Sequence, residues 1–217
     1  MKKVILAITL TALAAMAAFG QAGDDIKKGE GYIGYSNGQV DTGLDSGSDV
    51  GDFFRDRANF HGFNVQGTYN FNRFLGVKGD VSGTYNKTRF SETFVDPGTG
   101  GTFTSSFDTN NSLYNFVGGV QLKDNSKSGT FKPFAHAMAG LAHARTKVRD
   151  VTCTPTLNCP VFEDSFSENA LSGVFGGGLD IRVGDRFQLR AIQLDYNPIR
   201  FGGDTSHNVR IGAGIVF

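Results

Sequence analysis

Apolar and polar positions alternate along most of this chain with a period of two residues. Between residues 75 and 86, the odd positions are apolar or glycine, whereas the even positions are polar apart from one glycine. The same alternation runs through residues 63–71, 114–123 and 171–183. Successive side chains of a β-strand point to opposite faces, so each stretch predicts a strand with one apolar face and one polar face.

Four further stretches complete a prediction of eight strands. Residues 31–39 are short and glycine-rich, but they stand where a first strand is needed. Residues 131–145 are apolar or small on both faces, so the pattern does not say which face is inside. In residues 186–198 the apolar phase slips by one position, as a β-bulge near Ala191 would produce. The last strand, 207–217, alternates again and ends on a phenylalanine.

The connections between these strands differ in length. Three are long (39–58, 88–110 and 146–169), and four are tight to moderate (70–73, 123–130, 183–186 and 198–206). Alternation of tight and long connections is typical of a meander whose long loops gather at one end. The predicted fold class is therefore all-β, an eight-stranded antiparallel up-and-down β-barrel.

The first residues have the three parts of a secretory signal peptide. Lys2 and Lys3 are basic, residues 4–18 are apolar, and either Ala18-Phe19-Gly20 or Gly20-Gln21-Ala22 forms a small-residue cleavage site. We therefore expect a cleaved signal peptide at 1–22 and one barrel domain at 23–217. Downstream of the signal, no stretch approaches the roughly 18 apolar residues of a transmembrane helix.

Alternation alone does not say which medium surrounds the barrel. A soluble lipocalin-like barrel points its apolar side chains inward, whereas an outer-membrane barrel points them at lipid and fills its interior with polar ones. Strands of about ten residues match the length needed to cross a bilayer at a tilt. Aromatic residues that would form the interfacial girdles stand near strand ends, namely Tyr69, Phe71, Phe74, Tyr85, Phe90, Tyr114, Phe187 and Tyr196. These features favour a transmembrane β-barrel over the soluble alternative.

The polar faces would then place charges inside the barrel. The residues concerned are Lys78, Asp80, Lys123, Asp180, Arg182, Arg190, Asp195 and Arg210. An eight-stranded barrel has room inside only for side chains, and unpaired buried charges are costly. We therefore expect these residues to form an ion-paired network that plugs the lumen.

The chain resembles the small eight-stranded outer-membrane barrels of the OmpA-transmembrane-domain, OmpX and opacity-protein type. The resemblance rests on the signal peptide and on the segments KPFAHAMAGLAHA, RAIQLDYNP and HNVRIGAGIVF. It implies a location in the bacterial outer membrane and an assembly signal made of Val209, Ile211, Ala213, Ile215 and Phe217. It also implies insertion by the barrel assembly machinery, contact with outer-membrane lipid and lipopolysaccharide, a monomer, and an extracellular ligand bound through the loops.

The four histidines are the candidates for catalytic chemistry. His61 and His207 stand at strand starts near the loop end, whereas His136 and His143 fall within the fifth strand. Some outer-membrane barrels are lipid-modifying enzymes with a His and a Ser or an acid near the outer rim. Here Ser206 is the neighbour of His207, but adjacent strand residues point to opposite faces. We therefore interpret the histidines as interfacial polar residues and expect no enzymatic activity and no cofactor.

The long connections carry two further features. Cys153 and Cys159 lie close together, and in an exported protein they predict one loop disulfide. The residues Asp41, Asp45 and Asp49 are spaced four apart. Oxygen-rich loops can hold calcium, but this spacing matches no EF-hand, so we interpret the stretch as a polar loop without a metal. The connection 88–110 is rich in Gly, Thr, Ser and Phe, and we expect it to extend the flanking strands above the membrane.

Charge adds one exclusion. The 21 basic and 21 acidic side chains balance, so nothing suggests a nucleic-acid partner. The predicted function is a structural or surface-interaction barrel with long extracellular loops on a non-catalytic scaffold. The alternative is a small-solute pore, followed by a lipid-modifying enzyme and a soluble lipocalin-like binder.

Overall fold

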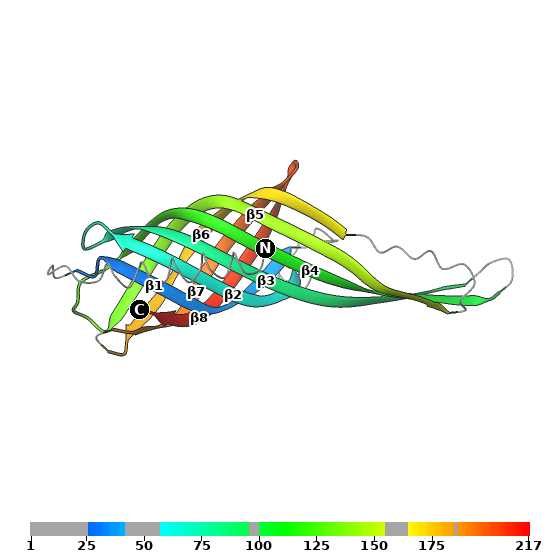
Figure 1. Ribbon diagram of the computed structural model, residues 1–217, viewed down its shortest axis with the longest axis horizontal. Helices are drawn as coiled ribbons and strands as arrows, with labels where there is room; N and C mark the ends of the chain where they lie inside the picture. Colours follow the sequence, from blue (N-terminus) through cyan, green and yellow to red (C-terminus); the bar gives the residue numbers. More distant parts are fainter. Residues whose placement is uncertain (1–25, 42–56, 96–99, 155–164, 185) are drawn as a thin grey trace, which may run out of the picture.

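A closed barrel of eight antiparallel strands forms the protein. A computed structural model describes residues 26–41, 57–95, 100–154, 165–184 and 186–217. Each strand pairs with its neighbours in sequence, and β1 pairs with β8 to close the barrel (Figure 1). The strands are β1 (Gly29–Asp41), β2 (Arg57–Asn70), β3 (Leu75–Val95), β4 (Thr102–Lys123), β5 (Phe131–Thr154), β6 (Ser165–Arg182), β7 (Gln188–Phe201) and β8 (Asp204–Val216). The predicted up-and-down barrel is confirmed.

The signal peptide expected at 1–22 lies outside the described residues and stays a prediction, as does the division at residue 22. No helix among the residues that the structure describes is long and apolar enough to cross a membrane.

Apolar side chains cover the outside of the barrel wall. On β3, Val77 and Val81 are exposed, whereas their sequence neighbours Lys78 and Asp80 are almost completely buried. The other strands repeat this arrangement, and the exposed apolar residues include Ile33, Phe63, Phe116, Leu141, Leu171, Phe175, Leu194, Ile211 and Ile215. A continuous exposed apolar band around a buried polar interior is the inverted arrangement of a membrane barrel.

The two ends of the barrel differ. The short connections between β2 and β3, between β4 and β5, and between β6 and β7 lie at the end where β8 finishes (Figure 1). In outer-membrane barrels the short turns are periplasmic and the longer loops extracellular, so this end is the periplasmic one. The opposite end is therefore the mouth that opens to the cell exterior.

The predicted slip in the seventh strand is present. The pairing of β7 with β8 shifts between Arg190 and Gln193, so one strand residue is extra there. As a result Arg190 and Gln193 both point inward and are buried, while Leu189 and Ile192 both face outward and are exposed. The bulge thus carries two polar side chains into the lumen without turning an apolar one away from lipid.

Three strands are much longer than the others. β3, β4 and β5 contain 21, 22 and 24 residues, whereas β1, β2, β7 and β8 contain 13 or 14. Beyond the outer edge of the barrel, residues 88–95, 102–109 and 148–154 form a three-stranded extension, which we call the arm (Figure 1). The connections 88–110 and 146–169 are therefore partly strand, as expected for 88–110 but not for 146–154.

The arm is held by its own contacts rather than by the barrel core. Phe90 and Phe107 stack with ring centroids 5.3 Å apart. The hydroxyl groups of Thr93 and Thr104 form a hydrogen bond of 3.2 Å across the pairing of β3 with β4. Polar residues occur on both faces of these strands. Periodicity alone therefore does not show where the strands of the arm begin and end.

The C-terminal strand closes the barrel as expected. Phe217 exchanges backbone hydrogen bonds of 2.8 and 2.9 Å with Gly31 at the start of β1. Ile211, Ala213 and Ile215 are exposed on the outer face, and Arg210 is buried in the lumen. These positions place the proposed assembly signal on the lipid-facing side of β8, and its recognition during insertion stays a prediction.

Candidate functional site: the lumen and the outer mouth

Arg210 joins two carboxylates in the middle of the lumen. Its guanidinium donates to Asp195 Oδ2 from Nε at 2.9 Å and from Nη2 at 2.6 Å. It also donates to Asp80, from Nη1 at 3.0 Å and from Nη2 at 2.8 Å, and to Ser82 Oγ at 2.9 Å. Both carboxylates are fully buried, so Arg210 supplies the charge that makes their burial tolerable.

Arg190 occupies the next level toward the periplasm. It donates to both carboxylate oxygens of Asp180, at 2.7 and 3.1 Å, a bidentate contact. Its Nη1 also donates to Gln66 Oε1 at 2.6 Å and to Gln193 Oε1 at 2.7 Å. Because Gln66 lies on β2 and Arg190 on β7, the bond between them crosses the lumen.

Two aromatic rings enclose the Arg190 guanidinium. Its central carbon lies 4.3 Å from the ring centre of Tyr32 and 4.1 Å from that of Phe134, both cation–π distances. Glycines leave room for these rings. A β-carbon added at Gly34 would lie 2.1 Å from the Tyr32 hydroxyl, and one at Gly178 would lie 2.8 Å from the Phe134 ring. The inward glycines are thus spaces for neighbouring side chains.

Lys123 forms the periplasmic level of the lumen. Its ammonium donates to both oxygens of Glu30, at 3.0 and 2.9 Å, to Asp180 Oδ2 at 2.8 Å, and to Gln188 Oε1 at 3.1 Å. Glu30 lies on β1 and Lys123 on β4, so this contact also spans the interior. Glu30 was not in the predicted network, although it occupies an inward phase of β1.

Lys78 on β3 and His136 on β5 connect Asp195, a partner of Arg210, to the wall formed by β3, β4 and β5. Lys78 Nζ donates to Gln121 Oε1 at 3.0 Å and lies 3.2 Å from His136 Nδ1. The other ring nitrogen of His136, Nε2, lies 2.9 Å from Asp195 Oδ1. His136 is buried in the lumen, so its interpretation as an interfacial residue is wrong. The sequence of β5 shows no clear polar face, so its pattern does not predict that His136 points inward.

Eight of the buried charged residues that the structure describes bond to one another or to neighbouring lumen side chains. We call the following eight residues the lumen charge cluster: Lys78, Lys123, Arg190, Arg210, Glu30, Asp80, Asp180 and Asp195. It contains four cations and four carboxylates, every one of them buried. Seven of its members were singled out from the sequence. Three of the ion pairs that link the cluster cross the lumen, and two, Arg190–Asp180 and Arg210–Asp195, join adjacent strands.

The eighth predicted lumen residue, Arg182, has a different position. It is half-buried at the periplasmic end of β6 and donates to the backbone carbonyls of Lys127 and Gly184. Lys132 on β5 behaves in the same way and donates to backbone carbonyls of the same turn, among them that of Ser126. Both cations hold turns at the barrel end rather than carboxylates in the middle of the lumen.

Apolar side chains fill the lumen above the charge cluster. Val117, Met138 and Val174 pack together on one wall. Toward the mouth a second group follows, made of Phe60, Leu113, Ala142, Ala170 and Ile199. The interior is therefore not polar throughout, contrary to the simple inverted pattern. The expectation failed here because the inward positions of β4, β5 and β6 change from polar to apolar along the same face.

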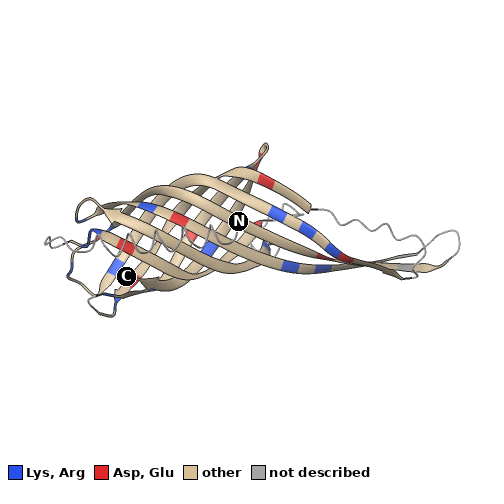
Figure 2. Cartoon of the chain, in the orientation of Figure 1, with Lys and Arg blue, Asp and Glu red and all other residues tan. Residues whose placement is uncertain are grey.

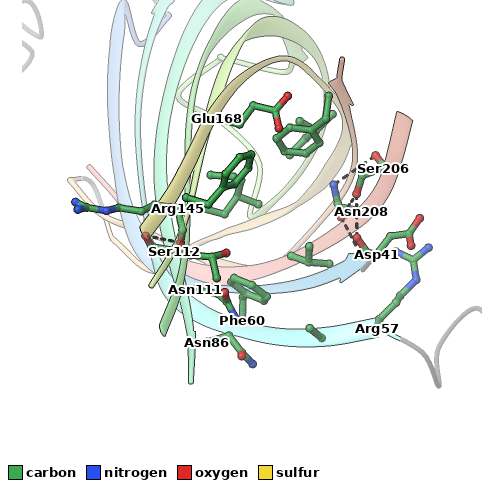
Figure 3. A pocket seen from close by; sticks show the side chains of 18 of the residues that line it. Asp41, Arg57, Phe60, Asn86, Asn111, Ser112, Arg145, Glu168, Ser206 and Asn208 are labelled. Carbon is green, nitrogen blue, oxygen red and sulfur yellow. Dashed lines mark hydrogen bonds between the residues drawn. The ribbon is translucent and has the colours of Figure 1, made fainter. Parts of the chain in front are cut away.

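A cavity of about 920 Å³ opens above this apolar group (Figure 3). Phe60 lies against its floor, and Glu168 points into it from β6. On its rim Ser206 Oγ donates to Asp41 O and to Asn208 Oδ1, each at 3.1 Å. The arrangement is an apolar cup with a polar rim at the extracellular end.

Histidines and tyrosines ring the outer face below the mouth. Tyr35 stacks on His61 and is hydrogen-bonded to its ring, and Tyr196 makes the same pair with His207 at 2.5 Å. His143, also on the outer face, lies 2.8 Å from Asn169 Oδ1. These histidines are interfacial, as interpreted. His207 thus faces outward while Ser206 bonds inward, so the two side chains diverge.

Two predicted features lie partly beyond the described chain. Cys153 stands near the end of β5 in the arm, but Cys159 lies outside the described residues, so the disulfide stays a prediction. Asp45 and Asp49 of the first loop likewise lie outside them. Asp41 is described, and it receives hydrogen bonds from β8 through its carboxylate and its carbonyl.

Comparisons with known proteins agree with this architecture. The family model described as outer membrane protein beta-barrel domain matches residues 6–217. The crystal structure of Ail, the attachment invasion locus protein of Yersinia pestis, in complex with the heparin analogue sucrose octasulfate is similar, with a TM-score of 0.51 and 21% identity over 88% of this chain and 99% of Ail.

Two other solved structures have lower scores. Neisserial surface protein A gives a TM-score of 0.46 and 14% identity over 87% of this chain and 95% of its own. OprG of Pseudomonas aeruginosa gives 0.42 and 13% over the same shares. A comparison with curated protein sequences finds no match.

The family match, the closed eight-stranded barrel and the exposed apolar band together confirm the expected location in the bacterial outer membrane. The resemblance on which that expectation rested is confirmed as well. The chain belongs to the family of outer membrane proteins with a β-barrel domain.

Proposed function

We propose that this protein is a closed structural barrel that carries the arm and the loops to the cell surface for interaction with other molecules. The observation that carries the proposal is the lumen charge cluster. Arg210 on β8 reaches Asp80 on β3, and Lys123 on β4 reaches Glu30 on β1. Since an eight-stranded barrel has room only for side chains, bonded side chains across it oppose the passage of solutes.

The arm supports the surface role. It continues three neighbouring strands past the mouth, so its position is set by the hydrogen-bond ladder of the barrel itself. The arm exposes polar and aromatic side chains, and such side chains commonly bind partner molecules. The membrane-spanning wall does not require them at this position. The divergence of Ser206 from His207 supports a role without catalysis at the rim.

Conductance in planar lipid bilayers tests the closed lumen. The refolded barrel, checked by its heat-modifiable mobility on gels, should give no stable channels under conditions where a general porin conducts. Stable, uniform channels from the same preparation would overturn the closed barrel and favour the small-solute pore.

Labelling of intact cells tests the display of the arm. An epitope tag inserted between Gly100 and Gly101 lies at the outer end of β4, where the pairing with β3 has ended. Antibody should label this tag on intact cells, whereas a tag inserted in the periplasmic turn at Ser128 should need permeabilised cells. Labelling of both tags only after permeabilisation would contradict the surface role.

A further inference from the structure

An acidic side chain points into the cavity at the outer mouth. Glu168 lies near the start of β6 and shares the inward phase of Ala170 and Ser172, both of which are buried. Its side chain points into the cavity in Figure 3. Among the described residues, Glu168 forms no hydrogen bond and no ion pair. A half-buried carboxylate above an apolar floor favours a positively charged partner, because fewer water molecules solvate it there.

A second acid adds negative charge to the same part of the rim. Asp204 begins β8 and lines the cavity, on the inward phase that Asn208 and Arg210 continue. Its carboxylate likewise forms no hydrogen bond or ion pair with another described residue. β7 lies between β6 and β8, so Glu168 and Asp204 stand on one arc of the barrel.

The two arginines that line the cavity are directed elsewhere. Arg145 lies on the outward phase of β5 and points away from the cavity in Figure 3. Arg57 donates to the backbone carbonyls of Gln39 and His207. In the lining that the structure describes, the charges on inward phases are therefore those of Glu168 and Asp204.

These acids are separate from the lumen charge cluster. Figure 2 shows red and blue bands in the periplasmic half of the barrel and again toward its outer end, with uncharged wall between them. Inside the barrel, the buried apolar residues Val117, Met138 and Val174 pack together above the cluster. As far as the described chain shows, no member of the cluster lines the cavity. The cations of the cluster bind their own partners, so the negative charge at the mouth is not offset from below.

Aromatic rings stand around the same cavity. Phe60, Phe90, Phe166 and Phe201 line it from β2, β3, β6 and β7. Phe60 is buried in the floor, whereas Phe90 and Phe166 are exposed nearer the exterior. The face of an aromatic ring attracts a cation, and an aromatic lining is a common means of recognising organic ammonium ions. The lining thus offers apolar surface and affinity for positive charge together.

We propose that the mouth cavity binds an organic ammonium ion with a short apolar body, its charged nitrogen at Glu168. An anion would meet two acids, and an inorganic cation would gain nothing from the apolar floor. The N–H groups of a primary ammonium can donate charge-assisted hydrogen bonds to the carboxylate, while the carbon skeleton packs on Phe60. A volume of about 920 Å³ lies within the range of small-molecule sites. The inference goes beyond the proposed function, because neither a closed lumen nor display of the arm requires a ligand at the mouth.

Three variants isolate the features that carry the proposal. Glu168→Gln removes the charge and keeps the size of the side chain. Ala144→Phe fills the cavity, since Ala144 lines it on β5 in register with Glu168. Asp150→Asn is the control, because it removes one acid from an exposed position on the arm where asparagine tolerates the φ of 53°. Heat-modifiable mobility must show that each variant folds.

Phenethylamine is the probe, with phenethyl alcohol and hydrocinnamate as its neutral and anionic counterparts. Each compound is titrated at neutral pH into the refolded barrel in maltoside detergent, which carries no charge. The methyl resonance of Ile199 reports binding, because Ile199 belongs to the apolar floor and lines the cavity. A titration of detergent alone corrects for partition into micelles.

The unaltered protein should bind phenethylamine about ten-fold more tightly than either counterpart, because hydrogen bonds to a charged group exceed those between neutral groups. Glu168→Gln should weaken the binding of phenethylamine about ten-fold and leave that of phenethyl alcohol unchanged. Ala144→Phe should weaken the binding of all three compounds. Asp150→Asn should bind them like the unaltered protein.

Several outcomes would overturn the proposal. Equal binding of the three compounds would show an apolar cavity without preference for a cation, and tighter binding of hydrocinnamate would show an anion site. Equal losses in Glu168→Gln and Asp150→Asn would assign the effect to overall charge. Binding that survives Ala144→Phe, or an Ile199 resonance that does not move, would place phenethylamine outside the cavity. Conductance and tag labelling measure other properties, so failure here and failure of the proposed function are distinguishable.

Discussion

The lower and upper halves of the lumen are built from the same strands by opposite means. In this lower half, Arg210 and Lys123 bind carboxylates across the interior, and Arg190 binds Asp180 on the adjacent strand. Near the mouth, Phe60 and Ile199 pack in an apolar group below an open cavity. The lower half is stabilised by ion pairs, and removal of one partner leaves the other charge buried and unpaired. The upper half is stabilised by apolar packing, and truncation of one side chain removes only part of the buried contact area.

The largest effect is expected in the lower half. Replacing Arg210 with methionine leaves Asp80 and Asp195 buried without their shared cation, so the free energy of unfolding should fall by about 3–5 kcal/mol. Urea unfolding of the barrel in lipid vesicles measures this loss. Arg200→Met removes an exposed guanidinium and serves as the control. Equal stabilities of the two variants would show that the lower lumen does not depend on its charge pairs.

A smaller effect is expected in the upper half. Ile199→Ala deletes a fully buried side chain, but the cavity above it lets neighbours and water adjust. We expect a loss of about 2 kcal/mol, the lower end for such truncations, in the same unfolding assay. Ile199→Leu keeps the volume and should cost less than about 1.5 kcal/mol. A loss as large as that of Arg210→Met would remove the contrast between the halves.

The smallest effect concerns an ion pair outside the lumen. Arg73 and Asp124 join two periplasmic turns through an exposed contact of 3.1 Å, and the hydrogen bond from Arg73 holds the pKa of Asp124 below its usual range. Because the folded pKa is depressed, the stabilisation is complete above about pH 4 and is lost as the pH falls toward the lower folded value.

Solvent and salt screen that pair, so Arg73→Ala should change stability far less than Arg210→Met at neutral pH. As the pH falls below about 4 toward that lower value, the difference in stability between the unaltered protein and the Arg73 variant should shrink, as unfolding at a series of pH values would reveal. If Arg73→Ala lowered the free energy of unfolding at neutral pH as much as Arg210→Met does, burial would not explain the difference in strength between the lumen ion pairs and this exposed pair.

The outer face of the barrel was largely predictable from the sequence, because lipid demands an apolar residue at every second position over about ten residues. Leu189 and Ile192 even revealed the bulge between them. The inner face was predictable only where it was charged. Val117 and Val174 stand on the same faces as polar residues, and periodicity cannot show that they form an apolar layer inside the lumen.

Two residues of the lumen site were missed for different reasons. Glu30 continues the inward phase of Tyr32 on β1 and would have been found by extending the predicted first strand by one residue. His136 lies among alanines on a strand with no polar face, and only the pairing of β5 with its neighbours shows that it points inward. The arm was harder still, since its strands lie outside lipid and need no apolar face.

The length of β3, β4 and β5 has a mechanical consequence. These strands run without a break from the periplasmic turns to the arm, apart from the register shift between Ser106 and Asp108. No linker separates the arm from the wall, so a sideways pull on its tip is transmitted as shear along the hydrogen-bond ladders between these strands. Many bonds loaded together in shear resist more than bonds opened one by one, and a partner bound to the arm would therefore pull on the whole membrane-spanning wall.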